Sequence, residues 1–322
     1  MAKKTDKDIF SEFVGQEGPK RKLNYRYQKW MDGAIFPNLF IVAPKGCGKT
    51  AFATQLGESM AQHQKGREFL AETCSGYKNM EVFMNNVIMP KVHGKRVTVL
   101  LDECHGLPKD VQTAFLTMIA PNKNHRTTFA WSEYEIEIDF REQTFIFATT
   151  EPQKVIDPLQ DRLREVGFQP YQDHHLAEIL TNTLEGLKFD PEVLKEIATS
   201  LRGNPRQAVM MAEDIHGHCV ADKVKKFTRA HWDVLRKSLD VLPLGLTRNE
   251  ARALEAMNDS KDLSLTCLAA RLDMTPQSVR AGLEKYLQKL RLMEVRTAGR
   301  TLTAKGIEYL NNHAAEINQL QV

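Results

Sequence analysis

The sequence is short of the features that mark membrane and secreted proteins. None of its apolar runs approaches the ~20 residues that a membrane-spanning helix requires. Its first ten residues, MAKKTDKDIF, lack the apolar segment of a secretory signal. Only five cysteines occur among 322 residues, and their odd number and scattered positions do not suggest a disulfide framework. We therefore expect a cytoplasmic protein without a membrane partner.

An excess of one charge is equally lacking. The 44 lysines and arginines nearly balance the 41 aspartates and glutamates, which leaves a net charge of +3. A general affinity for nucleic acid cannot follow from this total, so any nucleic-acid site must come from a local cluster. Short-period repeats and low-complexity tracts are also lacking. The length predicts two or three globular domains of about 100–200 residues each.

The most informative segment has the pattern strand, loop, helix. The apolar run NLFIVA (38–43) is followed by PKGCGKT (44–50) and then by AFATQLGESMAQ (51–62), whose apolar residues have helical spacing. This is the context of a phosphate-binding loop, in which backbone N–H groups and a helix N-terminus hold phosphate oxygens. Lys49 would reach the β- and γ-phosphates, and Thr50 would ligate Mg²⁺. The alternative is a glycine-rich turn with an exposed lysine.

This loop departs from the usual signature at its first position. Ala43 stands where the signature has glycine. Because the close approach to phosphate falls at Gly46 and Gly48, one additional methyl group at Ala43 should be tolerated. Cys47 places a thiol inside the loop, and we hypothesise that its oxidation or alkylation would block nucleotide binding.

A pair of acids follows a second apolar run, in RVTVLLDECHGL (96–107). A carboxylate at the C-terminal end of a buried strand can hold Mg²⁺, and the next acid can polarise a water molecule. We assign Asp102 to the metal side and Glu103 to the general base. His105 is interpreted as a structural or coupling residue rather than a metal ligand. The alternative is a pair of solvated acids after a strand.

A third apolar run, QTFIFATT (143–150), ends in two threonines. One of the hydroxyls of Thr149 and Thr150 could orient the attacking water near the γ-phosphate. By itself this signal is weak, because threonine is common in strands. Three apolar strands separated by helical segments nevertheless predict an α/β fold with a parallel sheet.

The last part of the chain has the pattern of a winged helix. Three helical segments between residues 247 and 290 are followed by strand, glycine turn, strand and helix in residues 291–310. Arginines on such a turn can reach a DNA groove or phosphates. The candidate DNA contacts are Arg280, Lys285, Arg296 and Arg300. The alternative is a protein–protein module, since winged helices also serve in that role.

The motifs, taken in order, resemble those of the AAA+ ATPases, and most closely those of the RuvB family of Holliday-junction branch-migration motors. The resemblance covers residues 8–312. Its segments are FSEFVGQ (10–16) for adenine packing, APKGCGKT (43–50) for Walker A, LLDECHGL (100–107) for Walker B, FIFATT (145–150) for sensor 1, PLQDRLREVGF (158–168) for the arginine finger and RGNPRQA (202–208) for sensor 2.

The resemblance implies three domains: an AAA+ parallel-sheet ATPase domain (1–168), a small all-α lid (169–238) and a C-terminal winged-helix DNA-binding domain (239–322). It also implies the cofactors ATP and Mg²⁺, with Thr50 and Asp102 on the metal. The implied nucleotide contacts are Val14, Gly15, Gly46, Gly48, Lys49, Thr50, Ala51, Tyr171 and Arg206. Tyr171 is one residue out of register with the family's nucleotide-contacting tyrosine.

The same resemblance assigns catalytic and DNA-binding roles. The implied catalytic residues are Lys49, Asp102, Glu103, Thr150 and Arg162. Arg162 would act as an arginine finger on a neighbouring subunit, with Arg164 as the alternative finger. Arg296 and Arg300 match arginines of the family's wing, although this turn is one residue shorter.

The hairpin expected at residues 127–140 departs from the family, in which a longer hairpin binds the partner protein RuvA. Its tip carries Trp131 and Tyr134. These rings could anchor a RuvA-like or other partner, stack on bases or fold back on the protein.

Together these features predict an ATP-driven motor that assembles into a ring, with a hexamer expected. It would translocate duplex DNA to drive Holliday-junction branch migration in recombination or repair. Two alternatives remain: a clamp or helicase loader, which hydrolyses ATP on delivering its cargo, and a nucleotide-gated DNA-binding adaptor.

Overall fold

The structure is a computed structural model that describes residues 8–120, 123–222, 224–260 and 262–319. Its contacts divide the chain into two compact units. The first unit comprises Met1–Ile179 with Gly203–Gln207, and the second comprises Leu180–Arg202 with Ala208–Val322. The winged helix and most of the predicted lid therefore belong to the second unit. Residues 169–179 of the predicted lid and most of the sensor 2 segment belong to the first.

The first unit is built on a five-stranded parallel sheet, which confirms the predicted fold class. The strand order is β2-β3-β6-β1-β7. The strands are β1 (Leu39–Val42), β2 (Glu68–Thr73), β3 (Val97–Asp102), β6 (Gln143–Thr149) and β7 (Arg164–Gly167). The three predicted strands are the central ones, and all three are almost completely buried. The two edge strands were not predicted from the sequence.

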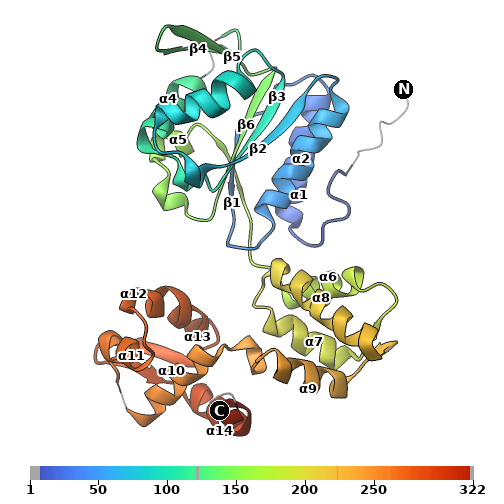
Figure 1. Cartoon of the computed structure of the whole chain (residues 1–322), viewed down its shortest axis with the longest axis vertical. Helices are drawn as coiled ribbons and strands as arrows, with labels where there is room; N and C mark the ends of the chain where they lie inside the picture. Colours follow the sequence, from blue (N-terminus) through green and yellow to red (C-terminus); the bar gives the residue numbers. More distant parts are fainter. Residues whose placement is uncertain (1–7, 121–122, 223, 261, 320–322) are drawn as a thin grey trace. The chain divides into compact units, whose positions relative to one another are not determined.

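Helices cover both faces of this sheet, with α1 and α2 on one side and α4 and α5 on the other (Figure 1). The α-helices of this unit are α1 (Glu17–Met31), α2 (Lys49–His63), α3 (Met80–Phe83), α4 (Lys109–Met118) and α5 (Asp157–Gln160), and α6 (Asp173–Thr183) crosses the boundary between the two units. Short turns form η1 (Cys74–Gly76), η3 (Cys104–Gly106) and η4 (Pro152–Lys154), and η2 (Met84–Val92) is a π-helix. Phe115 of α4 packs edge-on against Phe145 and Phe147 of β6, at ring-centroid distances of 5.4 and 5.0 Å.

The strand order brings three distant segments to one edge of the sheet. Strand β6 lies between β3 and β1, so the C-terminal ends of these three strands are neighbours. In the parallel register, Asp102 is level with Ala148 and Val42 is level with Thr149. Ligands of open α/β sheets bind at such carboxyl ends.

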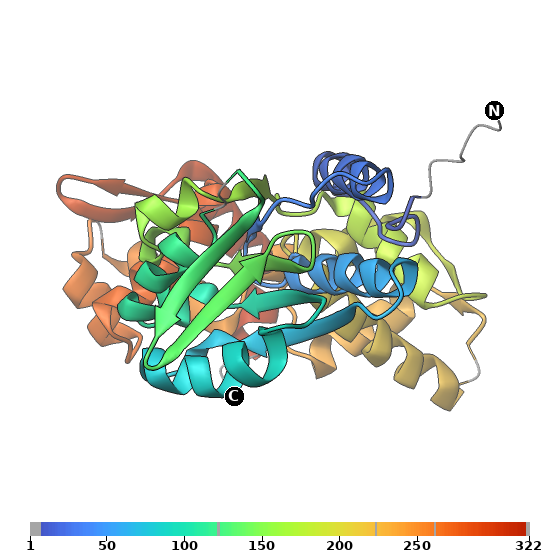
Figure 2. The same cartoon turned by 90° about the horizontal axis from the view of Figure 1, so that it is seen from above.

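An antiparallel hairpin lies at the other end of β6. Strands β4 (Arg126–Trp131) and β5 (Tyr134–Asp139) confirm the predicted hairpin. It extends at the top of Figure 1 and is nearest the viewer in Figure 2. Since it precedes the start of β6, it lies at the opposite end of the sheet from the three carboxyl ends.

The second unit begins with the helical lid. Its helices are α7 (Pro191–Ser200), most of α8 (Pro205–Asp222) and α9 (Arg229–Ser238). A short parallel pair, β8 (Lys188–Phe189) with β9 (Lys226–Phe227), adds strand to a segment that was predicted to be all-α. The pair was missed because two-residue strands carry no periodic pattern.

The winged helix completes the second unit. Its helical elements are η5 (Pro243–Gly245), α10 (Arg248–Asp259), α11 (Leu265–Arg271), α12 (Pro276–Ser278), η6 (Val279–Glu284), α13 (Lys285–Lys289) and α14 (Ala304–Gln319). The wing is the antiparallel hairpin of β10 (Met293–Arg296) and β11 (Gly299–Leu302). Apolar side chains of α10, α11, α13 and α14 form its core. In the described residues, no helix is both long and apolar enough to cross a membrane.

Candidate active site

The backbone conformation of the loop after β1 favours glycine at two positions. Gly46 and Gly48 have φ angles of 81° and 86°, in the left-handed region that glycine adopts without steric cost. A β-carbon on Gly46 would lie 2.2 Å from Oδ1 of Asn204. Ala43 is buried, and its N–H donates to the carbonyl of Thr149 at 3.2 Å. The alanine therefore continues the strand, and its methyl group is accommodated in the core.

Lys49, at the start of α2, lies between the two acids that follow β3. Its Nζ is 2.7 Å from Oδ1 of Asp102 and 2.7 Å from Oε1 of Glu103. Burial lowers the Lys49 pKa, but hydrogen bonds to both acids outweigh burial, so the pKa is raised. Burial likewise raises the Asp102 pKa, but the bonds from Lys49 and Thr50 outweigh it, so this pKa is lowered. Lys49 and Asp102 are therefore both charged at neutral pH.

Two hydroxyl groups complete this cluster. Thr50 Oγ1 donates to Oδ2 of Asp102 at 2.6 Å, and Thr150 Oγ1 donates to Oε2 of Glu103 at 3.3 Å. The structure thus brings Lys49, Thr50, Asp102, Glu103 and Thr150 together from three separate segments. Their individual catalytic roles stay predictions.

His105 lies beside Glu103, at the carboxyl end of β6. Its Nδ1 is 2.9 Å from Oγ1 of Thr149 and 3.3 Å from Oε2 of Glu103. Its Nε2 is 3.4 Å from Oε1 of Glu151. Glu103 itself has a φ of 52°, which is uncommon for a residue other than glycine. His105 therefore contacts the carboxylate of Glu103, a residue whose backbone has an unusual conformation.

The segment predicted to pack on adenine is anchored by aromatic rings. Phe52 of α2 lies 5.0 Å from Phe10, 4.4 Å from Phe13 and 5.0 Å from Phe168 between ring centroids. Because α2 begins at Lys49, these contacts hold the segment to the helix that carries the phosphate loop.

Gly15 and Tyr171 lie close to this helix start. Gly15 has a φ of 64°, and a β-carbon there would lie 3.2 Å from the ring of His175. Tyr171 is buried, and its hydroxyl lies 3.8 Å from the position of a β-carbon on Gly48. Burial raises the pKa of Tyr171 to about 12. Tyr171 therefore contacts the phosphate loop despite its shift in register. Val14 is half-buried beside Gly15.

Three of the predicted arginines, Arg162, Arg164 and Arg206, are exposed, as is Ala51. Arg162 donates from a guanidinium nitrogen to the carbonyl of Pro158 at 2.7 Å. Arg164 lies on the edge strand β7, two residues further on. Arg206 lies in the first turn of α8, where its backbone N–H donates to Oδ1 of Asn204 at 3.0 Å. The roles of Arg162, Arg164 and Arg206 stay predictions.

The structure argues against the hypothesis that Cys47 is reactive. Its side chain is 2% exposed, and burial raises the pKa of the thiol. The thiolate is the form that reagents attack, so Cys47 is both shielded and poorly ionised. Cys267 is the exposed one of the five cysteines.

The wing presents one of its two predicted arginines and not the other. Arg296 is 59% exposed and pairs with Glu294 on the same strand. Arg300 is only 12% exposed, and its Nε donates to Oε1 of Glu284 at 2.7 Å. This ion pair, in which the guanidinium neutralises a buried acid, argues against a DNA contact by Arg300, and that contact stays a prediction. Arg280 and Lys285 are exposed.

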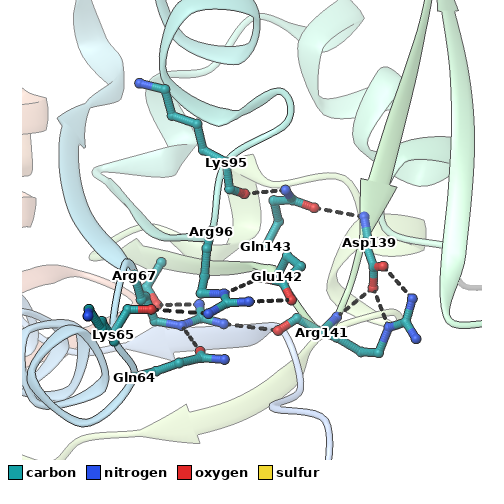
Figure 3. Close-up of polar contacts among 10 residues, drawn as sticks. Gln64, Lys65, Arg67, Lys95, Arg96, Asp139, Arg141, Glu142 and Gln143 are labelled. Atoms are coloured by element: carbon teal, nitrogen blue, oxygen red, sulfur yellow. Dashed lines mark hydrogen bonds and ion pairs between the residues drawn. The ribbon is translucent and has the colours of Figure 1, made fainter.

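A polar network fixes the base of the β4–β5 hairpin to the sheet (Figure 3). Asp139 at the end of β5 accepts hydrogen bonds from Arg126 at 3.0 Å and from Arg141 at 2.8 and 2.5 Å. Arg141 lowers the pKa of Asp139 to about 2. Arg96 pairs with Glu142 at the start of β6. The backbone N–H of Asp139 donates to Oε1 of Gln143 at 2.7 Å, which ties the hairpin base to the first residue of β6.

The two rings of the hairpin tip lie in different environments. Trp131 is half-buried and packs against the main core. Tyr134 is 59% exposed. Glu133, Glu135 and Glu137 are exposed on the same hairpin, and Glu137 pairs with Arg126 at 3.0 Å.

Sequence reasoning missed two residues that touch the predicted site. Asn204 lies against Gly46, and His175 lies against Gly15. The asparagine sits inside the sensor 2 segment, so its place in the motif was an available signal. No local pattern distinguished His175 from its neighbour His174.

The fold and site together define the class of this protein. A parallel sheet of order β2-β3-β6-β1-β7 carries a phosphate loop after β1, an acid pair after β3 and a polar threonine after β6. A helical lid follows in the chain. This is an AAA+ ATPase.

Comparison with known proteins identifies a narrower family. Residues 39–171 match the ATPase family associated with various cellular activities (AAA), and residues 243–311 match the RuvB C-terminal winged helix domain. The chain is a divergent RuvB-like AAA+ ATPase.

Relatives and solved structures agree over nearly the whole chain. The Holliday junction branch migration complex subunit RuvB of Mycoplasmopsis pulmonis is 22% identical, over 96% of this chain and 99% of the relative. The same subunit of Thermotoga petrophila is 24% identical, over 95% and 91%. A solved structure of the Thermotoga maritima RuvB Holliday junction branch migration motor has a TM-score of 0.73 at 20% identity, over 95% of this chain and 98% of that one.

Proposed function

We propose that this protein is an ATP-driven motor that translocates duplex DNA and drives branch migration at Holliday junctions, in recombination or repair. One observation carries the proposal. A clustered set of ATPase side chains and a RuvB-type winged helix are joined in one chain, in the order found in relatives named as branch-migration subunits. We also propose that it acts in the cytoplasm, where DNA is accessible and where its cysteines would stay reduced.

The side chains at the phosphate loop are suited to ATP with Mg²⁺. Lys49 would bind the β- and γ-phosphates, and Gly46 and Gly48 would let backbone N–H groups face them. Thr50 Oγ1 and Asp102 Oδ2 lie 2.6 Å apart and are hard oxygen donors, which Mg²⁺ prefers. When bound there, Mg²⁺ would neutralise charge on the phosphate oxygens.

Glu103 would take the proton of the attacking water. Its carboxylate is contacted by Lys49, Thr150 and His105, which restrict its orientation. A general base must be held within hydrogen-bonding reach of the proton that it accepts. Thr150 would share in orienting the water, because its hydroxyl lies at the same carboxyl edge.

Assembly into a homo-oligomeric ring, with a hexamer expected, follows from the role proposed for Arg162. An arginine finger acts on the nucleotide of a neighbouring subunit. Arg162 is exposed, so a second copy of the chain could receive it.

The β4–β5 hairpin is the proposed docking element for a RuvA-like or other partner. Its anchored base would keep the tip in a constant orientation. Because the hairpin carries exposed Glu133 and Glu135 near its tip, we expect the partner's complementary surface to be basic.

The function is tested by two assays on the full chain. ATP hydrolysis is measured with and without a four-way DNA junction, and migration of the junction is followed with and without a RuvA-type protein. We expect DNA-stimulated hydrolysis and ATP-dependent migration. Stimulation without migration would favour a loader, and DNA binding without hydrolysis would favour an adaptor.

Arg296→Ala is expected to weaken DNA binding without loss of folding. Arg296 is exposed on the wing, and each lost phosphate contact should reduce the salt slope of binding by ~0.9. DNA affinity is measured over a range of salt concentrations. Arg248→Ala, which removes an exposed arginine of α10 outside the candidate DNA contacts, serves as the control.

Thermal unfolding distinguishes the roles of the two wing arginines. Arg300→Ala should lower the thermal stability of the winged helix, because it leaves buried Glu284 without its partner. If Arg296→Ala leaves the salt slope unchanged, the wing is not a DNA contact.

A further inference from the structure

Arg202 lies two residues after the lid helix α7, and its side chain contacts residues of the winged helix. It has a φ of 58° and is the first residue of the sensor 2 segment (202–208). One guanidinium nitrogen donates to Oε1 of Glu250 at 3.0 Å, and a second donates to Oε2 of the same carboxylate. Its Nε donates to the carbonyl of Gly245 at 2.8 Å. The guanidinium also lies 3.9 Å from the ring centre of Tyr286.

Glu250 is a buried charge whose binding capacity is fully used. It is 1% exposed. Besides Arg202, its carboxylate accepts the backbone N–H of Thr247 at 2.8 Å and the Thr247 hydroxyl at 3.1 Å, which caps α10. A bidentate pair of this kind fixes orientation as well as distance. Arg202 is therefore held to α10 by a directional contact rather than by a flexible surface pair.

Neighbouring contacts hold the same joint between lid and winged helix. Arg236 of α9 donates to both carboxylate oxygens of Glu316 in α14, at 3.0 and 2.9 Å. The connecting segment is tightly packed, since a β-carbon on Gly245 would lie 2.1 Å from the carbonyl oxygen of Ser200. The lid and the winged helix are thus joined by two Arg–Glu pairs and a close-packed linker.

Arg202 also lies next to residues that contact the phosphate loop. The chain passes from the second unit to the first between Arg202 and Gly203. Two residues after Arg202, Asn204 lies against Gly46 of the phosphate loop. A displacement of Asn204 would reach Arg202 through two peptide units, which are stiff except at φ and ψ.

We propose that the Arg202–Glu250 contact is the mechanical link that passes the nucleotide state of the phosphate loop to the DNA-binding winged helix. The link rests on the proposed function, because it presumes that the winged helix binds DNA. A movement of the phosphate loop would displace Asn204, and the displacement would reach Arg202 through the backbone. Arg202 would then move α10 through its contact with Glu250. Arg202 is a positioning residue, since it contacts none of the side chains in the proposed catalytic cluster.

Arg202→Lys is the decisive variant. Lysine keeps the positive charge beside Glu250 and so protects folding, but it loses the fork geometry and the stacking on Tyr286. DNA affinity is measured in the presence of ADP and of a non-hydrolysable ATP analogue. In the unaltered protein the two affinities should differ by about 5- to 150-fold, the usual range of coupling between sites. In Arg202→Lys this ratio should fall close to one, while DNA-independent ATP hydrolysis is retained.

Two further variants keep the result interpretable. Glu250→Gln retains an acceptor for the α10 cap and should also collapse the ratio. Arg236→Lys loosens the same joint through the other ion pair, which is not next to the sensor 2 residues, and should keep the ratio. Thermal unfolding checks that each variant is folded.

The outcomes separate this link from the proposed function. A wild-type ratio in Arg202→Lys, an equal loss in Arg236→Lys, or a ratio of one in the unaltered protein would overturn the link. An unaltered protein that shows a nucleotide-dependent ratio, but does not migrate junctions, would overturn the motor function and leave the link standing.

Discussion

Lys49→Ala is expected to abolish measurable ATP turnover and to weaken ATP binding severely. The Lys49 ammonium lies 2.7 Å from each acid of the site and is the cation placed at the phosphate loop. Removal of one preorganised group that stabilises developing charge typically lowers the rate by ~10²–10³-fold. The loss should exceed this range here, because Mg²⁺ would then be the one remaining counter-charge between the phosphates and the two acids. Titration with a fluorescent ATP analogue and phosphate release measure the two effects.

Two variants make this result specific. Lys45→Ala removes an exposed lysine from the same loop and should leave binding and turnover close to normal. Glu103→Gln should bind ATP and lose turnover by ~10²–10⁴-fold, the usual contribution of a general base. Normal turnover in Lys49→Ala or in Glu103→Gln would refute the assignment of the site.

Arg162→Ala is expected to keep ATP binding and to lose turnover by ~10³–10⁵-fold, the measured range for arginine fingers. The physical reason is that the guanidinium would stabilise charge that develops only as the phosphoryl group transfers. Arg162 is exposed and comes from the segment before the edge strand β7, so it is available to a second copy. Phosphate release at several protein concentrations should rise more steeply than linearly, because active sites would form only at subunit contacts.

Mixing inactive variants tests whether Arg162 acts in trans. Lys49→Ala subunits retain Arg162, and Arg162→Ala subunits retain an intact phosphate loop. A mixture should therefore recover activity that neither variant has by itself. Arg164→Ala is the matched control two residues away and should keep most activity. If Arg164→Ala loses turnover and Arg162→Ala does not, Arg164 is the finger; if mixing restores nothing, the arginine does not act between subunits.

Much of the fold follows from short-range patterns. The strands β1, β3 and β6 are nearly continuous apolar runs, as expected for strands that are buried on both faces. The edge strand β2, EFLAET, is half-exposed, and its pattern is too mixed to predict. Strand β7 has only four residues. Both strands exist because they pair with central neighbours, which is information outside their own sequence.

In the candidate site, too, local patterns identified the residues, and long-range packing decided their contacts. The glycines, Lys49 and the acid pair were found because each lies at a fixed place after a strand. That they meet depends on β6 lying between β3 and β1. The turn suggested that Arg300 would be exposed, but Glu284, sixteen residues earlier, supplies a buried partner that the local pattern does not reveal.

The sequence by itself determined the phosphate loop, the order of the motifs, the helical periods and the winged-helix pattern. These are local properties, set by backbone conformation and by the spacing of apolar residues within a few turns. Only the tertiary structure decided that Trp131 packs inward, that Arg300 is paired and that Arg202 holds Glu250 across forty-eight positions of chain. The physical reason is that a side chain's partner is set by the long-range packing that brings it near, and a local pattern carries no record of that packing.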